Sequence, residues 1–279
     1  MRKGHYIAII SALVLIGVLY WLPNTKPPKP EEQPMLPMAS GETHQTTDDG
    51  FSIDSLLTEA ISTLPEHASE DYKALQDKLG GADDKSLIYN NIAELMLEHK
   101  QYAAAAHFFT EKAKLDNSEK SLNFAGRFNL DLLHNAETAP VRAWAAQNAI
   151  ANFEQSLKVN PDNDTVKMAL ASAYVDGTSQ PMQGIQLLLG ITRENPDNIP
   201  ANLMLGQLSI RSGQYDKAQS RFEKVIELEP ENTEALYFLA EVYKNKGDKQ
   251  KAIELLEKCK KIINDPKFSN DVDNYIKSF

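Results

Sequence analysis

The chain has 279 residues, of which 42% are hydrophobic and 24% charged, and its formal net charge is -10. This composition is typical of a globular protein with one or two domains. The negative charge argues against nucleic acids and anionic lipid surfaces as partners of the main domain, because binding to either needs a basic face.

The first element is an apolar segment at residues 6–22, which contains no charged residue. Seventeen helical residues extend over about 25 Å, enough to cross the hydrocarbon layer of a membrane. Tyr20 and Trp21 lie where interfacial aromatic residues are common. A cleaved signal peptide is the alternative, but its apolar core would be shorter, and no small-residue cleavage site follows Leu22. We therefore expect residues 1–22 to form a cytoplasmic tip and an uncleaved transmembrane anchor.

Basic residues lie on both sides of this segment. Arg2 and Lys3 precede it, whereas Lys26 and Lys29 follow it. Together with the amino terminus, Arg2 and Lys3 favour a cytoplasmic N-terminus. The sequence thus predicts a single-pass protein of a bacterial inner membrane, with its main domain periplasmic or otherwise extracytoplasmic.

Residues 23–50 contain six prolines, followed by polar and acidic residues. Such a segment cannot bury a core, so we expect a Pro-rich disordered linker. In the next segment, 51–85, Ile53, Leu57 and Ile61 recur at helical spacing. We expect one helix there, a second one around 72–79, and a role for both as N-terminal capping helices. Residues 267–279 predict a C-terminal capping helix.

Between these caps the sequence repeats itself with a period of 34 residues. Small residues, glycines, a large apolar residue and a helix-breaking residue recur at fixed positions. One copy has Gly206, Gly213, Ala218, Phe222 and Pro230, and the next has Ala240, Gly247, Ala252, Leu256 and Asn264. Partial copies lie upstream and include Ile92-Ala93 with Met96, Phe124-Ala125 with Phe128, and Leu170-Ala171 with Tyr174.

A 34-residue period with this pattern resembles the tetratricopeptide repeat (TPR) family, in its membrane-anchored bacterial form. The resemblance covers residues 86–266 as five helical hairpins, with an insertion near 134–144. It implies an all-α fold, a TPR-type α-solenoid of about five helical hairpins behind a single N-terminal transmembrane helix. Each hairpin would bury its apolar face only by stacking on its neighbours.

The spacing also has a direct physical reading. Gly206 and Ala218 are small enough to let two helices cross closely, and Phe222 would fill the gap towards the next hairpin. Gly213 lies in the turn, where a positive φ angle is common. Pro230 cannot continue a helix, and the Asn and Asp residues after it can cap the next one.

TPR proteins hold peptide segments in a groove lined by the first helix of each hairpin. Helical phase assigns fourteen residues to this concave groove. They are Asn90, Glu94, Leu122, Gly126, Asn129, Met168, Ser172, Val175, Leu203, Gln207, Ile210, Tyr237, Glu241 and Lys244. The partners predicted by the resemblance are other proteins or peptide segments, with no nucleic acid and no small-molecule substrate.

No catalytic motif is present in the sequence. The six histidines are scattered without metal-binding spacing, and there is no phosphate-binding or nucleophile-elbow signature. Asp83-Asp84 is read as a helix cap, and Cys259, at an apolar helical position, as a buried small side chain. We therefore expect no enzyme, no cofactor and no metal.

Two functions remain open on this basis. The first is a membrane-anchored scaffold or adaptor that holds partner segments in the groove. The alternative is a periplasmic chaperone-like assembly factor for exported proteins, of the cytochrome c maturation or translocon-accessory type. An adaptor has one stoichiometric partner, whereas a chaperone binds unfolded clients weakly and promiscuously.

Overall fold

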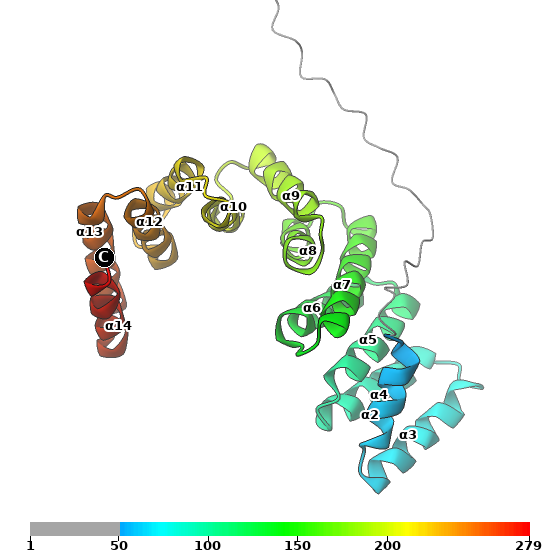
Figure 1. Ribbon diagram of the computed structural model, residues 1–279. Coiled ribbons are helices and arrows are strands. Elements are labelled where there is room, and N and C mark those ends of the chain that lie inside the picture. Colours follow the sequence, from blue (N-terminus) through cyan, green and yellow to red (C-terminus); the bar gives the residue numbers. More distant parts are fainter. Residues whose placement is uncertain (1–50) are drawn as a thin grey trace, which may run out of the picture. The chain divides into compact units, whose positions relative to one another are not determined.

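The computed structural model describes residues 51–279, which fold into thirteen α-helices and no strand (Figure 1). The predicted all-α fold is confirmed for this part of the chain. Within it, no helix is both long and apolar enough to cross a membrane. The predicted anchor at 6–22 and the linker at 23–50 lie outside the described residues.

Ten of the helices form five hairpins that follow one another along the chain. The hairpins are α4 (Lys85–Glu98) with α5 (Tyr102–Asp116), α6 (Glu119–Asn135) with α7 (Ala139–Val159), α8 (Asp164–Gly177) with α9 (Pro181–Glu194), α10 (Ile199–Arg211) with α11 (Tyr215–Leu228), and α12 (Thr233–Asn245) with α13 (Lys249–Ile263). The second helix of each hairpin packs on the first helix of the next. In Figure 1, α6, α8, α10 and α12 follow one another on one side of this stack, and α7, α9, α11 and α13 on the other.

The hairpins begin and end as the sequence predicts. Asn163, Asn198 and Asn232 cap α8, α10 and α12, and each side-chain oxygen accepts a hydrogen bond from a backbone N–H three residues later, at 2.9–3.1 Å. Asp84 caps α4 in the same way. Pro161, Pro196 and Pro230 follow the ends of α7, α9 and α11. At the ends of α5 and α13, Asn117 and Asn264 instead adopt the left-handed conformation.

The turn inside a hairpin has the same backbone in three of the repeats. Gly213 and Gly247 have φ angles of 71° and 85°, and Lys100, seven residues after Ala93, has a φ of 61°. Each of these three residues donates its backbone N–H to the carbonyl oxygen of the residue three positions earlier. The residue that follows it donates its own N–H to the carbonyl oxygen five positions earlier. Glycine adopts this left-handed backbone without strain, whereas lysine does not.

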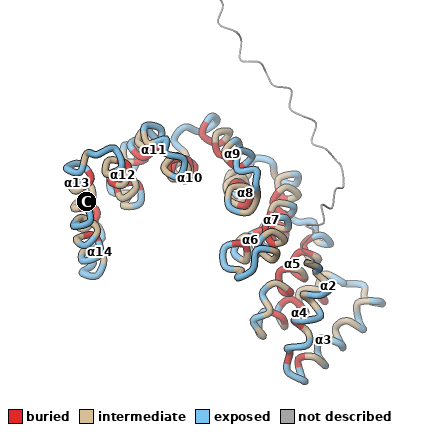
Figure 2. Tube along the Cα trace, in the orientation of Figure 1, coloured by how far each residue is buried: buried red, intermediate tan, exposed pale blue. Residues whose placement is uncertain are grey.

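The two helices of a hairpin cross at small residues. A β-carbon at Gly206 would lie 2.5 Å from Cζ of Phe222, and one at Gly184 would lie 2.4 Å from the carbonyl oxygen of Ala171. Buried residues accordingly collect where helices face each other (Figure 2). Phe222 also stacks on Phe238 of the next hairpin, with ring centroids 5.7 Å apart, so it links two repeats as predicted.

The insertion near 134–144 forms no separate element. It lengthens both helices of the second hairpin, so that α6 has 17 residues and α7 has 21, against 13 to 15 in the other hairpins. The added turns have their own small core, in which Leu133, Ala145 and Ala146 are buried. This core reaches the end of α8, because a β-carbon at Gly177 would lie 2.4 Å from that of Ala146.

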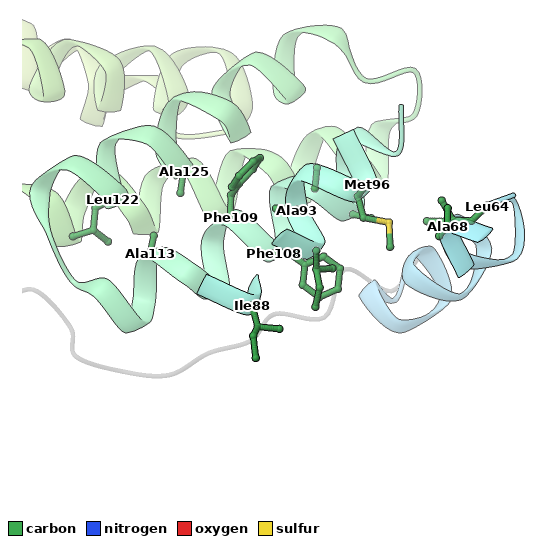
Figure 3. Packing of buried hydrophobic residues seen from close by; sticks show 14 residues of the cluster. Leu64, Ala68, Ile88, Ala93, Met96, Phe108, Phe109, Ala113, Leu122 and Ala125 are labelled. Carbon is green, nitrogen blue, oxygen red and sulfur yellow. The ribbon is translucent and has the colours of Figure 1, made fainter. Parts of the chain in front are cut away.

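Two helices precede the first hairpin, and one follows the last. They are α2 (Ile53–Ser62), α3 (Glu66–Leu79) and α14 (Pro266–Lys277). The first packs on α5, the second on α4 and the third on α13. Met96 of α4 extends towards Leu64 and Ala68 of the α2–α3 segment (Figure 3). All three helices therefore bury the outer faces of the terminal hairpins.

Candidate protein-binding groove

The predicted groove residues all lie on the first helices of the hairpins, but they differ in exposure. Ten of the fourteen are exposed or half-buried: Asn90, Glu94, Met168, Ser172, Val175, Gln207, Ile210, Tyr237, Glu241 and Lys244. Several of their polar groups form hydrogen bonds with other side chains of the protein. Asn90 donates a hydrogen bond to Glu94 at 2.8 Å, and Gln207 donates one to Glu234 of the next hairpin at 2.8 Å.

Three predicted groove residues in α6 are buried and do not lie on an open surface. Leu122 is 2% exposed and Asn129 is fully buried, while Gly126 packs beneath Phe153. Gly126 contacts Phe153 as Gly206 contacts Phe222, so Gly126 rather than Ala125 is the crossing residue of this hairpin. The helical phase therefore shifts by one residue, and the counterparts in α6 are Asn123, Arg127 and Leu130, of which Arg127 is exposed and the other two are half-buried.

Leu203 is also buried, with 9% of its surface exposed. It belongs to the core that contains Ala235 and Leu239 of α12. The corresponding position of the next repeat is Tyr237, which stacks on Tyr275 of α14 with ring centroids 6.1 Å apart. In these two repeats the position thus packs on a following helix, α12 for Leu203 and α14 for Tyr237.

The final helix covers part of the predicted groove. The ammonium group of Lys244 lies 4.1 Å from the ring centroid of Tyr275 and 4.7 Å from that of Phe279. Cation–π contacts of this kind fix a lysine over the aromatic faces. The accessible part of the groove therefore lies on α4 to α10, and α14 closes it at α12.

The sequence did not predict a row of polar side chains that runs along the first helices. Asp176 of α8 accepts a hydrogen bond from Arg211 of α10 at 3.1 Å and lies 3.4 Å from Nε2 of His134 in α6. Ser172 donates a further bond to Asp176 at 3.1 Å. Asp176 and Arg211 each directly follow a predicted groove residue, so widening the predicted stripe by one position would have found both.

This arrangement presents a mixed polar and apolar surface. The accessible groove combines half-buried apolar side chains with charged groups of both signs, which suits a mixed peptide surface. Within residues 51–279 no cluster of three His, Cys, Asp or Glu side chains could hold a metal ion. Burial raises the pKa of the Cys259 thiol to about 11, which keeps it protonated and unreactive.

Comparison with known proteins agrees with this architecture. The sequence profile of the tetratricopeptide repeat family matches residues 209–268. Over 205 residues the chain is 25% identical to cellulose synthase operon protein C of Pseudomonas fluorescens (strain SBW25). That alignment covers 72% of this chain but 15% of the relative.

A solved structure has a similar fold. A tetratricopeptide repeat protein from Parabacteroides merdae ATCC 43184 is 14% identical, with a TM-score of 0.50, and the match covers 81% of this chain and 92% of that one. MamA from Desulfovibrio magneticus RS-1 is 20% identical, with a TM-score of 0.49, over 65% of this chain and 96% of that one.

The match at 209–268 supports the predicted resemblance to the tetratricopeptide repeat family for this part of the chain, whereas the membrane-anchored form stays a prediction. Proteins of this family act in protein–protein interactions by binding other proteins or peptide segments. The fold is typically non-catalytic, and these relatives indicate no enzyme family.

Proposed function

We propose that this protein is a membrane-anchored scaffold that holds a segment of a partner protein against the first helices of its hairpins. The observation that carries the proposal is the row of accessible groups from α6 to α10. His134, Asp176 and Arg211 come from three consecutive hairpins and lie next to one another. Half-buried Val175 and Ile210 are their immediate neighbours in sequence. A peptide lying along this row would meet apolar and charged groups in alternation.

The location is part of the proposal. The uncharged segment at 6–22 and the basic residues Arg2 and Lys3 support a single anchor in a bacterial inner membrane, with the repeats on the extracytoplasmic side. A scaffold so placed would concentrate its partner at the membrane surface. Protease added to spheroplasts should then digest the repeats, and protection until lysis would contradict this orientation.

Capture of the partner tests the function. The full chain would be crosslinked in membranes and purified with its partner, and the yield compared with that of Gln207→Ala and Arg211→Ala. Both variants should lower capture roughly fivefold, because each removes an accessible contact at the α10 end of the row. Glu254→Lys on α13, a second helix, is the matched control and should capture normally.

The pattern of captured proteins separates the two hypotheses. One partner in constant ratio to the chain supports a scaffold. Many unfolded exported proteins, each in small amount, would support the chaperone-like assembly factor instead. Normal capture by both groove variants together with loss in the α13 control would place the site on the second helices.

A further inference from the structure

A cleft opens on the side of the stack opposite the groove, between the second helices α9 and α11. Its volume is about 690 Å³, and the floor is formed by α10. The wall on α9 is apolar and includes Ile185 and Leu189, and Leu205 and Leu208 line the floor. Figure 1 shows α10 lying between these two second helices.

The cleft exists because one large side chain is missing from this repeat. Ser209 of α10 lines the cleft, and the equivalent residues of the neighbouring first helices are Tyr174 and Tyr243. Each tyrosine hydroxyl donates a hydrogen bond to a glutamate of the preceding second helix, Glu154 at 2.6 Å and Glu223 at 3.2 Å. These tyrosines therefore bridge the first helix to the second helix before it.

In the repeat that contains the cleft, the glutamate of this bridge is replaced in addition to the tyrosine. Leu189 occupies the position that corresponds to Glu154 and Glu223. The small Ser209 hydroxyl is satisfied locally, since it donates to the carbonyl of Leu205 at 2.7 Å. Both partners of the tyrosine–glutamate bridge are thus absent together. The space is left apolar, without an unpaired polar group on Ser209.

The wall on α11 is basic, although the whole chain is strongly acidic. Lys217, Arg221 and Lys224 face the cleft at helical spacing. Lys224 is paired with Asp197 at 3.0 Å. The one carboxylate that lines the cleft, Asp216, is paired with Lys246 of the next hairpin at 2.7 Å. The charge left over in the cleft is therefore positive.

Arg221 is the notable member of this wall. Its guanidinium is half-buried and donates a hydrogen bond to the side-chain oxygen of Asn202 at 2.8 Å, a neutral acceptor. Within residues 51–279 no carboxylate lies within 4.0 Å of it. Burial lowers the pKa of this group, which reflects the cost of holding the charge partly away from water. The equivalent residues of α9 and α13 are Leu187 and Leu255, so the repeat does not need an arginine here.

We propose that this cleft is a second protein-docking site, which takes an acidic peptide segment carrying an aromatic side chain. The aromatic ring would enter the space beside Ser209 and Leu189 that tyrosine fills in the neighbouring repeats. A carboxylate next to it would pair with Arg221, and Lys217 would strengthen the attraction. Arginine recognises carboxylates with two parallel hydrogen bonds, and such charge-assisted bonds are strong.

This site is independent of the groove on the first helices. The cleft is reached from the side of α9 and α11, whereas the polar row of Asp176 and Arg211 belongs to the first helices. A protein with both sites can hold two segments at once. Failure of one proposal leaves the other standing, because the variants that test them do not overlap.

Fluorescence anisotropy with the full chain tests the docking site directly. The probe is a short labelled peptide with one tryptophan flanked on both sides by aspartates. Two matched probes replace either the aspartates with asparagines or the tryptophan with alanine. The acidic aromatic probe should bind at least roughly tenfold more tightly than either, since each loses one of the two contacts.

Two variants of the chain probe the two halves of the cleft. Ser209→Tyr fills the apolar space with the side chain that neighbouring repeats already accommodate. Arg221→Leu removes the charge and introduces the residue found in α9 and α13. Each should weaken the acidic aromatic probe roughly tenfold or more. Arg193→Leu removes an exposed arginine outside the cleft and should leave binding unchanged.

Several results would overturn the proposal. Equal binding of the acidic and neutral probes would remove the role of Arg221, and unchanged binding by Ser209→Tyr would remove the role of the cavity. No binding of any probe would also contradict it. If circular dichroism shows that Ser209→Tyr has lost helix, Arg221→Leu with its Arg193→Leu control decides the outcome.

Discussion

The ring of Phe153 fills the space that a side chain at Gly126 would occupy: a β-carbon there would lie 2.5 Å from Cε1 of the ring. Phe222 stands in the same relation to Gly206 two hairpins later, again at 2.5 Å. These two contacts put α6 and α10 in the same register, although α6 and α7 are longer than their counterparts. The extra residues therefore extend the second hairpin at its turn and leave its crossing point unchanged.

The crossing contact predicts a specific loss of stability. Gly206→Ala or Gly126→Ala should lower the free energy of unfolding by about 1–3 kcal/mol, because the fully buried rings of Phe222 and Phe153 cannot move away freely. Gly190→Ala in α9 is the control, since nothing lies within 4 Å of a β-carbon there. It should stabilise the helix by up to about 1 kcal/mol. Urea unfolding monitored by circular dichroism measures all three, and equal midpoints would refute the assigned crossing.

The turns lead to two predicted changes in the unfolding free energy, which have opposite signs. Lys100→Gly should raise the unfolding free energy by about 0.5–1 kcal/mol, because it relieves a non-glycine residue at a φ of 61°. Gly213→Ala should lower it by about 1 kcal/mol, through its φ of 71° alone, since open space surrounds its α-carbon. Thermal unfolding should move in opposite directions for the two variants. A shift of the same sign in both would mean that backbone strain does not distinguish these turns.

Asp116 predicts a dependence of stability on acidity. Burial alone would raise the pKa of this carboxyl group, but hydrogen bonds from Lys112, Ser121 and Ser86 outweigh it and lower the pKa to about 2. The unfolded chain would have a pKa near the usual value of about 3.9. The stabilisation is thus complete above about pH 4 and is lost as the pH falls towards 2.

Comparison with a variant isolates this contribution. Between pH 5 and pH 2.5 the wild-type chain should lose up to about 2 kcal/mol more unfolding free energy than Asp116→Asn. Asp77→Asn, which changes an exposed carboxylate of α3, is the control and should follow the wild type. Parallel acid profiles for wild type and Asp116→Asn would show that the hydrogen bonds to Asp116 contribute little.

Leu203 provides a fourth prediction. Because this side chain is packed against α12, Leu203→Ala should destabilise the array by about 2–4 kcal/mol, whether or not a partner is present. Val175→Ala, at a half-buried groove position, should cost less. Unfolding measurements decide between these outcomes. A Leu203→Ala chain of unchanged stability would restore Leu203 to the binding surface.

The sequence predicts the repeats well because their determinants are local. A glycine at positive φ, an asparagine cap and a proline after a helix each act within a few residues, so spacing alone locates them. Two small residues stand side by side in α6, Ala125 and Gly126, and periodicity could not decide which one crosses α7. The contact with Phe153 decides it, and a contact between two helices cannot be derived from the periodicity of one of them.

The binding surface is predicted less completely, for a related reason. Helical phase shows which side of a helix a residue lies on, but not what covers that side. Leu203 and Tyr237 are covered by the next helix in the stack, and Lys244 is covered by Tyr275 of α14 and by Phe279, which follows that helix. The cleft at Ser209 could have been found from the sequence, by asking which repeat lacks the large residue found at Tyr174 and Tyr243.

Site-specific photocrosslinking tests the central claim, that the first helices hold a partner segment. A photoreactive residue would be placed at Ser172 or Gln207 on the first helices, and at Glu254 on α13 as the control. The scaffold predicts one crosslinked partner from both groove positions, with the attachment points in one contiguous segment of that partner, and no adduct from the control. Adducts from Glu254 with none from Ser172 or Gln207 would contradict it.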